Sequence, residues 1–128
     1  MKIDIITLFP EFFETLKTHS IVGRAIKNAK IEIATHSLRD YATDRSGTVD
    51  DHPYGGGPGM ILKVDVIARA LAAVKAQSSG MVILLTPQGQ VYKQGTAQKL
   101  ACEKSLILIC GHYEGFDERI REYVDMEL

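Results

Sequence analysis

The chain contains four short apolar runs, and each of them ends at a glycine, a proline or a polar turn. Residues 2–10 (KIDIITLFP), a run that Pro10 ends, and residues 31–37 (IEIATHS) are rich in β-branched side chains, whereas residues 81–85 (MVILL) and 105–110 (SLILIC) are almost continuously apolar. Apolar runs without alternation are typical of strands that are covered on both faces, as in a parallel sheet. We therefore predict four strands over these ranges.

Helical periodicity lies between and after these predicted strands. The strongest signal covers residues 64–77, where five apolar side chains fall on one face, namely Val64, Ile67, Ala68, Leu71 and Val74. Shorter helices are expected over residues 11–18, over 21–28 with Ser20 as N-cap, over 96–104, and from Phe116 through DERIREYV. Strands that alternate with helices favour one α/β domain with a parallel sheet flanked by helices.

A long polar stretch separates the second predicted strand from the strongest helix. From Leu38 to Gly59 no period is sustained, and residues 49–60 (VDDHPYGGGPGM) contain two acids, two prolines and four glycines. Glycine weakens helix and strand alike, and proline removes a backbone donor. Long irregular connections in compact domains are usually functional or disordered. We predict a functional loop, with high mobility over residues 44–59, although an acidic pair such as Asp50 and Asp51 taken alone is more often solvated in a mobile loop.

Two glycine-containing loops follow the last two predicted strands. Residues 86–89 (TPQG) and 111–115 (GHYEG) would lie side by side if these strands are neighbours, at the edge where open α/β sheets bind ligands. Glycine permits close backbone approach, tyrosine offers an aromatic surface, and glutamate accepts hydrogen bonds. The pair fits an adenosine-like ligand, whereas each loop taken alone is better explained as an ordinary turn that ends a strand.

Composition and charge exclude several classes of protein. The 128 residues carry 15 basic and 16 acidic side chains, a net charge of −1, so no overall basic field indicates a nucleic-acid partner. No apolar run approaches the ~20 residues that a bilayer requires, and a cytoplasmic protein with no membrane partner is expected. Five basic residues make either a modest phosphate-binding surface or scattered solubilising charges: Arg24, Lys27, Lys30, Arg39 and Arg45.

Several familiar catalytic motifs are missing from the sequence. GxGxxG, GxxxxGK, GxSxG and HExxH do not occur, and the four histidines have no metal-ligand spacing. Hydrolysis of nucleoside triphosphates is therefore not expected, and no metal site is predicted. We interpret Cys102 and Cys110 as small buried hydrophobes in preference to nucleophiles.

Four motifs taken together resemble a known family. LFPEFF, VDDHPYGGGPGM, LTPQG and CGHYEGFDERI occur in this order between Lys2 and the end of the chain. They are similar to the motifs of bacterial tRNA (guanine-N1)-methyltransferases, which belong to the trefoil-knotted SPOUT methyltransferases. The resemblance implies a SPOUT-type α/β knot domain that uses S-adenosylmethionine to methylate N1 of the guanine immediately 3′ of the tRNA anticodon. It also implies a homodimer whose active site is shared between subunits.

The resemblance assigns roles to individual positions of this sequence. It places two walls of the S-adenosylmethionine site at Leu85, Thr86, Pro87 and Gly89, and at Gly111, Tyr113, Glu114 and Gly115. It places the contacts to tRNA at Asp50, Gly55, Gly56, Gly57 and Gly59. Asp50 is also a candidate acid–base group, although the family's usual base is an aspartate that would lie beyond Leu128.

The resemblance covers roughly the first half of such an enzyme. The family continues into a third cofactor loop, the rest of the knot and a carboxyl-terminal tRNA-binding domain. We therefore expect residues 1–128 to be an incomplete methyltransferase domain, truncated before the knot is completed, that binds S-adenosylmethionine weakly and does not methylate tRNA alone. One alternative is a non-catalytic α/β module that holds an adenosine ligand or RNA. A second is a knotted methyltransferase of ribosomal RNA. The motif VDDHPYGGGPGM argues against this second alternative, because it resembles the guanine-N1 enzymes.

Overall fold

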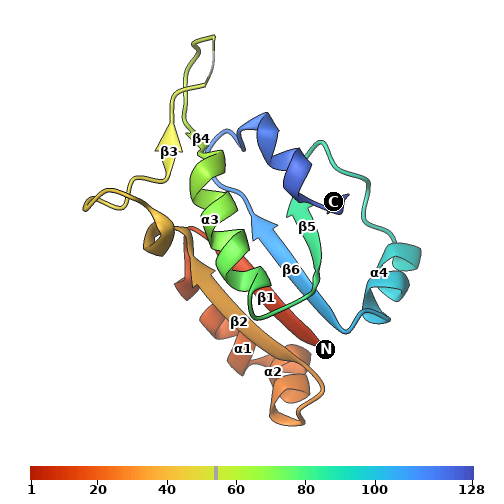
Figure 1. Cartoon of the computed structure of the whole chain (residues 1–128). Helices are drawn as coiled ribbons and strands as arrows, with labels where there is room; N and C mark the ends of the chain where they lie inside the picture. The colour runs from red at the N-terminus through yellow and green to blue at the C-terminus, as the bar shows by residue number, and fades with distance from the viewer. Residues whose placement is uncertain (54) are drawn as a thin grey trace.

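The protein folds around a five-stranded parallel sheet with the strand order β2-β1-β6-β5-β7 (Figure 1). The computed structural model describes residues 1–53 and 55–128; Tyr54, within the VDDHPYGGGPGM motif, lies outside the described residues. The strands are β1 (Lys2–Thr7), β2 (Glu32–Ser37), β5 (Met81–Leu85), β6 (Ser105–Cys110) and β7 (Met126–Glu127). All four strand pairings in the sheet are parallel, which confirms the predicted fold class and the four predicted strands.

The fifth strand, β7, was not predicted. It lies within the segment REYVDMEL and pairs with β5, so that Met126 is opposite Ile83. The backbone of Leu128 continues the pairing, since its N–H donates to the carbonyl of Leu84 at 2.9 Å and its carbonyl accepts from the N–H of Thr86 at 2.7 Å. A strand of two residues is too short to produce a hydrophobic period, which explains the missed prediction.

Helices cover both faces of the sheet. Helix α3 (Val64–Lys75) packs on one face and contributes to the larger core, whereas α4 (Gln94–Ala101) packs Leu100 against Ile83 and Leu106 in a second cluster on the other face. Figure 1 shows α1 (Glu14–Thr18) and α2 (Ser20–Lys27) behind β1 and β2. No helix in the described ranges is long and apolar enough to span a bilayer.

The predicted apolar face of α3 is partly wrong. Ile67 and the two apolar residues that follow it at helical spacing are buried, but Val64 and Ala68 are only half-buried, and Val66 and Ala70 are buried in their place. Helix α3 contacts the 3₁₀ helices η2 (Leu38–Tyr41) and η3 (Glu118–Tyr123) as well as the sheet. These extra contacts widen and rotate the buried face beyond a single stripe.

Helix termini also differ from the predictions. The first helical region begins as the 3₁₀ helix η1 (Pro10–Phe13), and the last is the 3₁₀ helix η3 with Asp117 as its N-cap. Ser20 does not cap α2, because it has φ +57° and His19 occupies the N-cap without a side-chain hydrogen bond. Only His19 separates α1 from α2, so the chain uses a left-handed residue to reverse direction instead of a cap.

The polar stretch between β2 and α3 forms a finger that projects away from the sheet (Figure 1). Its two sides are β3 (Asp50–Asp51) and β4 (Ile61–Leu62), which pair antiparallel. The base of the finger is anchored, because Val49 is fully buried and its carbonyl accepts from the N–H of Lys63 at 2.9 Å. The predicted absence of regular structure from Leu38 to Gly59 is therefore wrong for the 3₁₀ helix η2 at its start and for β3 at the base of the finger, and correct for most of the rest.

Candidate functional site

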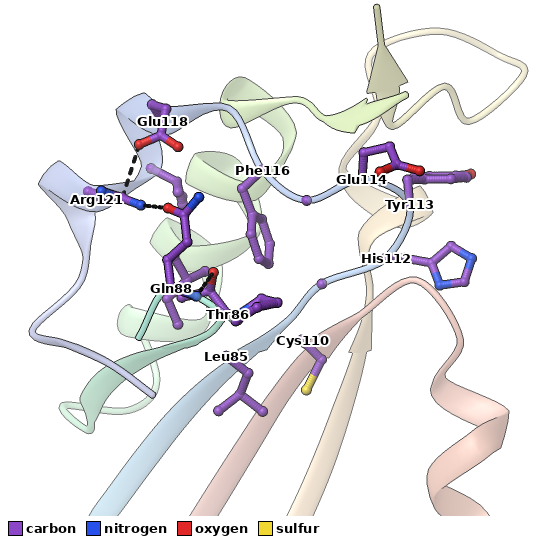
Figure 2. A pocket seen from close by; sticks show the side chains of 15 residues that line it. Leu85, Thr86, Gln88, Cys110, His112, Tyr113, Glu114, Phe116, Glu118 and Arg121 are labelled. Carbon is purple, nitrogen blue, oxygen red and sulfur yellow. Dashed lines mark hydrogen bonds and ion pairs between the residues drawn. The ribbon is translucent and has the colours of Figure 1, made fainter. Parts of the chain in front are cut away.

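The loops that follow β5 and β6 line a cavity of about 510 Å³ at the carboxyl edge of the sheet (Figure 2). The two strands are neighbours with Leu85 opposite Cys110, so both loops leave the sheet at the same level. Residues 84–88 form one wall, residues 110–116 form another, and η3 closes the cavity with Glu118, Ile120 and Arg121. The prediction that the two loops lie side by side is confirmed.

The first loop contributes Leu85, Thr86 and Pro87 to the cavity. Leu85 is 38% exposed although it ends a strand of buried residues, and it lines both this cavity and another, apolar cavity beside α4. Gly89 does not line this cavity. A Cβ atom added there would lie 2.5 Å from the backbone nitrogen of Leu128, so glycine permits β7 to approach the loop closely.

The second loop is a tight turn that places its side chains on two sides. Tyr113 has φ +59°, a left-handed conformation that is costly for a residue with a Cβ, and Gly115 has φ +122°. A Cβ atom added to Gly111 would lie 2.7 Å from the ring of Phe116, so the ring packs directly over the glycine backbone. Figure 2 shows Phe116 facing Thr86, with Tyr113 and Glu114 on the far side of the loop.

The finger is joined to the second loop by backbone hydrogen bonds. The N–H of Glu114 donates to the carbonyl of Met60 at 3.0 Å, and the N–H of Leu62 donates to the carbonyl of Gly115 at 2.9 Å. Gly59 has φ +92°, and a Cβ atom added to it would overlap Cγ of Glu114. The segment expected to meet RNA and the loop expected to meet the cofactor therefore form one unit.

The remaining predicted site residues do not line the cavity. Asp50 is half-buried in β3 and pairs with Leu62 in the antiparallel ladder. Gly55, Gly56 and Gly57 have φ of +89°, +79° and +131°, and a Cβ atom added to any of them would meet nothing within 4 Å. These three glycines thus lie in the finger with open space around them.

A buried carboxylate fixes the start of η3 beside the cavity. Asp117 is 7% exposed and accepts from the backbone N–H of Arg119 at 3.0 Å and from its guanidinium at 2.9 and 2.6 Å. The hydrogen bond from the Arg119 side chain is the main reason that the pKa of Asp117 lies below its usual value. Asp117 also donates its backbone N–H to the carbonyl of Leu62 at 3.1 Å, so it links η3 to the finger.

The two cysteines behave differently from each other. Cys110 borders the cavity, and burial raises the pKa of its thiol to about 11, which keeps the thiol protonated and unreactive near neutral pH. Cys102 is exposed at the end of α4, where its thiol donates to the carbonyl of Gln98 at 3.4 Å. The predicted burial of Cys102 is therefore wrong, because the last turn of α4 directs it to solvent.

The charged groups elsewhere belong to separate elements. Among the described residues no cluster of three or more His, Cys, Asp or Glu side chains is arranged to hold a metal ion. Arg24 and Lys27 belong to α2, whereas Arg39 belongs to η2 and donates to the carbonyl of Gly47 at 3.2 Å. Figure 1 shows α2 at the opposite end of the sheet from the finger, which favours scattered charges over one phosphate-binding surface.

The contribution of η3 to the cavity was not predicted from the sequence. Arg121 donates to Oε1 of Gln88 across the opening and forms ion pairs with Glu118 at 3.1 Å and Glu127 at 3.5 Å. The Glu118–Arg121 spacing of three residues was a usable signal, since such pairs lie on the same side of a helical turn. The contact with Gln88 has no signal in the sequence, because it joins residues that are distant along the chain.

Comparison with known proteins decides the family. The whole chain, residues 1–128, matches the family described as tRNA (Guanine-1)-methyltransferase TrmD. The chain belongs to this family. The family suggested by the four motifs is therefore confirmed, and the motifs LTPQG and CGHYEGFDERI of this TrmD family member form the two walls of the cavity.

Relatives of this TrmD family member match it over its entire length. Proteins named tRNA (guanine-N(1)-)-methyltransferase are 50% identical over 128 residues in Clostridium botulinum strain Hall and 52% identical over 131 residues in Chloroflexus aggregans. All of this chain is covered in both cases, but only 53% and 51% of those proteins. The chain spans about half the length of the curated relatives it matches.

A solved structure shares the fold of this TrmD family member. The crystal structure of tRNA (m1G37) methyltransferase from Aquifex aeolicus superposes with a TM-score of 0.92 at 37% sequence identity, covering 99% of this chain and 58% of that chain. The predicted SPOUT-type methyltransferase fold is thus confirmed for residues 1–128.

Proposed function

We propose that residues 1–128 form the amino-terminal, cofactor-binding part of a tRNA methyltransferase that transfers a methyl group from S-adenosylmethionine to N1 of the guanine immediately 3′ of the anticodon. One observation carries the proposal. The cavity between the loops after β5 and β6 is joined to the finger by backbone hydrogen bonds at residues 60–62 and 114–117, in a chain of the TrmD family. This arrangement supports one site that handles a small cofactor and an RNA together.

The cavity fits S-adenosylmethionine in size and chemistry. Its volume of about 510 Å³ lies within the roughly 300–1,000 Å³ of small-molecule sites. Leu85 and Phe116 contribute apolar lining suited to a planar base, and the missing side chain at Gly111 permits the ring of Phe116 to pack over the backbone there. Bound there, the cofactor would supply a methyl group on a positively charged sulfur. The carboxylate of Glu114 is suited to an amino or hydroxyl group of the same ligand.

We assign the proposed cofactor contacts to the two loops. The first wall is Leu85, Thr86 and Pro87, with Gly89 supporting it by its close approach to Leu128. The second wall is Gly111, Tyr113, Glu114 and Gly115. These residues bind and orient the cofactor, and Phe116 and Ile120 restrict the access of water to it. Orientation of this kind is a major source of rate acceleration in group transfer.

The finger is the proposed contact with tRNA. Gly55, Gly56 and Gly57 present backbone with open space around it, which permits close approach to an unpaired base, and Gly59 lies beside them against the side chain of Glu114. Asp50 offers a carboxylate that accepts hydrogen bonds from the N1 and N2 positions of guanine. Because Met60 and Leu62 bond to the second loop, a base held by the finger would lie next to the cofactor cavity.

The family resemblance supports further proposals for the intact enzyme. We propose that it is a cytoplasmic homodimer without a membrane partner, that its domain completes a trefoil knot, and that its catalytic base lies outside residues 1–128. In this proposal the described residues bind both substrates but do not complete the reaction. Asp50 remains a candidate for acid–base contact with the target base.

A methylation assay tests the proposal. The full-length protein is incubated with S-adenosylmethionine and tRNA transcripts that carry either guanine or adenine immediately 3′ of the anticodon, and digested products are analysed by mass spectrometry. We expect 1-methylguanine from the first transcript only, and no product with residues 1–128 alone. Cofactor and tRNA binding without product from the full-length protein would favour a non-catalytic binding module. Robust methylation of tRNA by residues 1–128 alone would refute the proposal that this part of the enzyme lacks residues needed for the reaction.

A further inference from the structure

Arg121 occupies a corner where three separate elements meet. It lies on η3, and its guanidinium contacts Glu118 on the same 3₁₀ helix, Glu127 on β7 and Gln88 in the loop after β5. A second, smaller cavity lies on the other side of this corner, and Gln88 and Arg121 line both cavities. Their contact therefore lies where the two cavities adjoin, and Figure 2 shows it among the residues that line the larger cavity.

The two carboxylates determine where the guanidinium points. Nε of Arg121 is 3.1 Å from Oε2 of Glu118 and 3.5 Å from Oε2 of Glu127, so both anions lie on the Nε side. The planar guanidinium then directs Nη2 toward Gln88, whose Oε1 accepts from it. A lysine could not reproduce this geometry, because an ammonium group has no rigid fork.

This contact orients the carboxamide of Gln88. A glutamine side chain has one acceptor end and one donor end, and occupation of Oε1 by Arg121 leaves the NH₂ group as the end available to a ligand. No hydrogen bond from Nε2 of Gln88 to another described residue is present. The loop backbone is held independently, since the N–H of Gln90 donates to the carbonyl of Glu127 at 3.0 Å.

We propose that Arg121 is a positioning residue that holds the Gln88 carboxamide as a hydrogen-bond donor toward an acceptor atom of the bound cofactor. The inference rests on the proposed function, because it assigns to one polar side chain a part in recognising the same ligand. Arg121 itself touches no ligand in this account. It acts through Gln88, and it couples the first cofactor loop to η3 and β7.

A double-mutant cycle in the full-length protein tests this inference. Affinity for S-adenosylmethionine is measured by calorimetry for the parent, Arg121→Ala, Gln88→Ala and the double variant, with Glu122→Ala as a control on the same 3₁₀ helix outside the cavity lining. We expect each single variant to bind about fivefold more weakly, as for the loss of one hydrogen bond, and the double variant to bind no more weakly than Gln88→Ala. The control should match the parent.

Two further variants separate positioning from simple packing. Gln88→Glu retains a partner for Arg121 but replaces the donor NH₂ with an acceptor, so it should lose as much affinity as Gln88→Ala without loss of thermal stability. Arg121→Lys keeps the charge but loses the fork, so it should resemble Arg121→Ala. NMR of the Gln88 side-chain amide in the ligand-free protein should show two shifted signals that move to random-coil positions in Arg121→Ala.

The outcomes of these experiments distinguish a failure of the proposed function from a failure of the role of Arg121. A parent protein that does not bind S-adenosylmethionine would overturn the proposed function and the inference with it. If the parent binds S-adenosylmethionine, two results would overturn the role of Arg121 alone. One is an Arg121→Ala variant with the affinity of the parent. The other is a double variant in which the affinity losses of the two single variants add. Gln88→Glu with parental affinity would show that the NH₂ group donates nothing to the ligand.

Discussion

At the scale of single residues, the site depends on backbone conformations that side chains would disturb. Gly59 and Gly56 both have positive φ, of +92° and +79°, but only Gly59 has a neighbour, the side chain of Glu114. Gly111 lies under the ring of Phe116 in the same way. The sequence could indicate that these glycines matter, but not which of them faces a side chain, since that depends on the packing of distant loops.

The pair Gly59→Ala and Gly56→Ala isolates the contact with Glu114. Both substitutions carry similar strain from positive φ, of the order of 1–2 kcal/mol in the free energy of unfolding. Gly59→Ala must also displace the Glu114 side chain, so we expect it to weaken cofactor binding several-fold while Gly56→Ala leaves it unchanged. Calorimetric titration and chemical unfolding measure the two effects. Equal cofactor affinity in both variants would exclude a role for the Gly59–Glu114 packing.

Asp117 predicts a specific dependence of stability on pH. Its pKa in the folded protein is lowered, chiefly by the hydrogen bond from Arg119, so the carboxylate stabilises the fold above the unfolded value of 3.8 and this contribution is lost as the pH falls through the lower folded value. We expect Asp117→Asn to cost about 1 kcal/mol near neutral pH, because Arg119 is largely exposed and screened. Urea unfolding at neutral pH and below pH 3.8 should show the difference shrinking with acid. A difference that does not change with pH would contradict the assignment.

At the scale of elements, apolar runs were sufficient to locate β1, β2, β5 and β6, and the two loops at the ends of β5 and β6 were predicted to be neighbours. The local pattern of apolar and polar residues did not predict the elements whose structure depends on long-range contacts. β7 is held by its pairing with β5, Ser20 adopts φ +57° at a one-residue junction, and the finger closes as a two-residue ladder. None of these has enough residues for a period to appear.

Substitution of Gly89 tests how β7 is attached. A Cβ atom at Gly89 would lie 2.5 Å from the backbone of Leu128, which cannot move without breaking its hydrogen bonds to Leu84 and Thr86. We expect Gly89→Ala to lower the free energy of unfolding by roughly 1–3 kcal/mol and to speed hydrogen exchange at the amides of Thr86, Gln90 and Leu128.

Gly95 provides the matched control for Gly89. It lies in α4 with nothing within 4 Å of an added Cβ atom, so Gly95→Ala should raise the free energy of unfolding by about 0.5 kcal/mol through helix propensity. Opposite signs for the two variants are the expected result. Unchanged exchange at Thr86 and Leu128 in Gly89→Ala would show that β7 is not held by this close approach.

At the scale of the whole molecule, the sheet, the two loops and the finger form one connected unit. The parallel sheet brings the two loops to one edge, η3 closes the cavity between them, and backbone hydrogen bonds from Met60 and Leu62 attach the finger. The central claim is that this cavity binds S-adenosylmethionine.

Calorimetric titration with S-adenosylmethionine tests that claim most directly. The full-length parent protein is compared with Gly111→Val, whose side chain would collide with the ring of Phe116 and displace it within the cavity, and with Gly95→Val as a glycine substitution away from the cavity. We predict binding by the parent and by Gly95→Val, with little or none by Gly111→Val while it stays folded. Binding of equal strength by Gly111→Val, or no binding by a folded parent, would contradict the account.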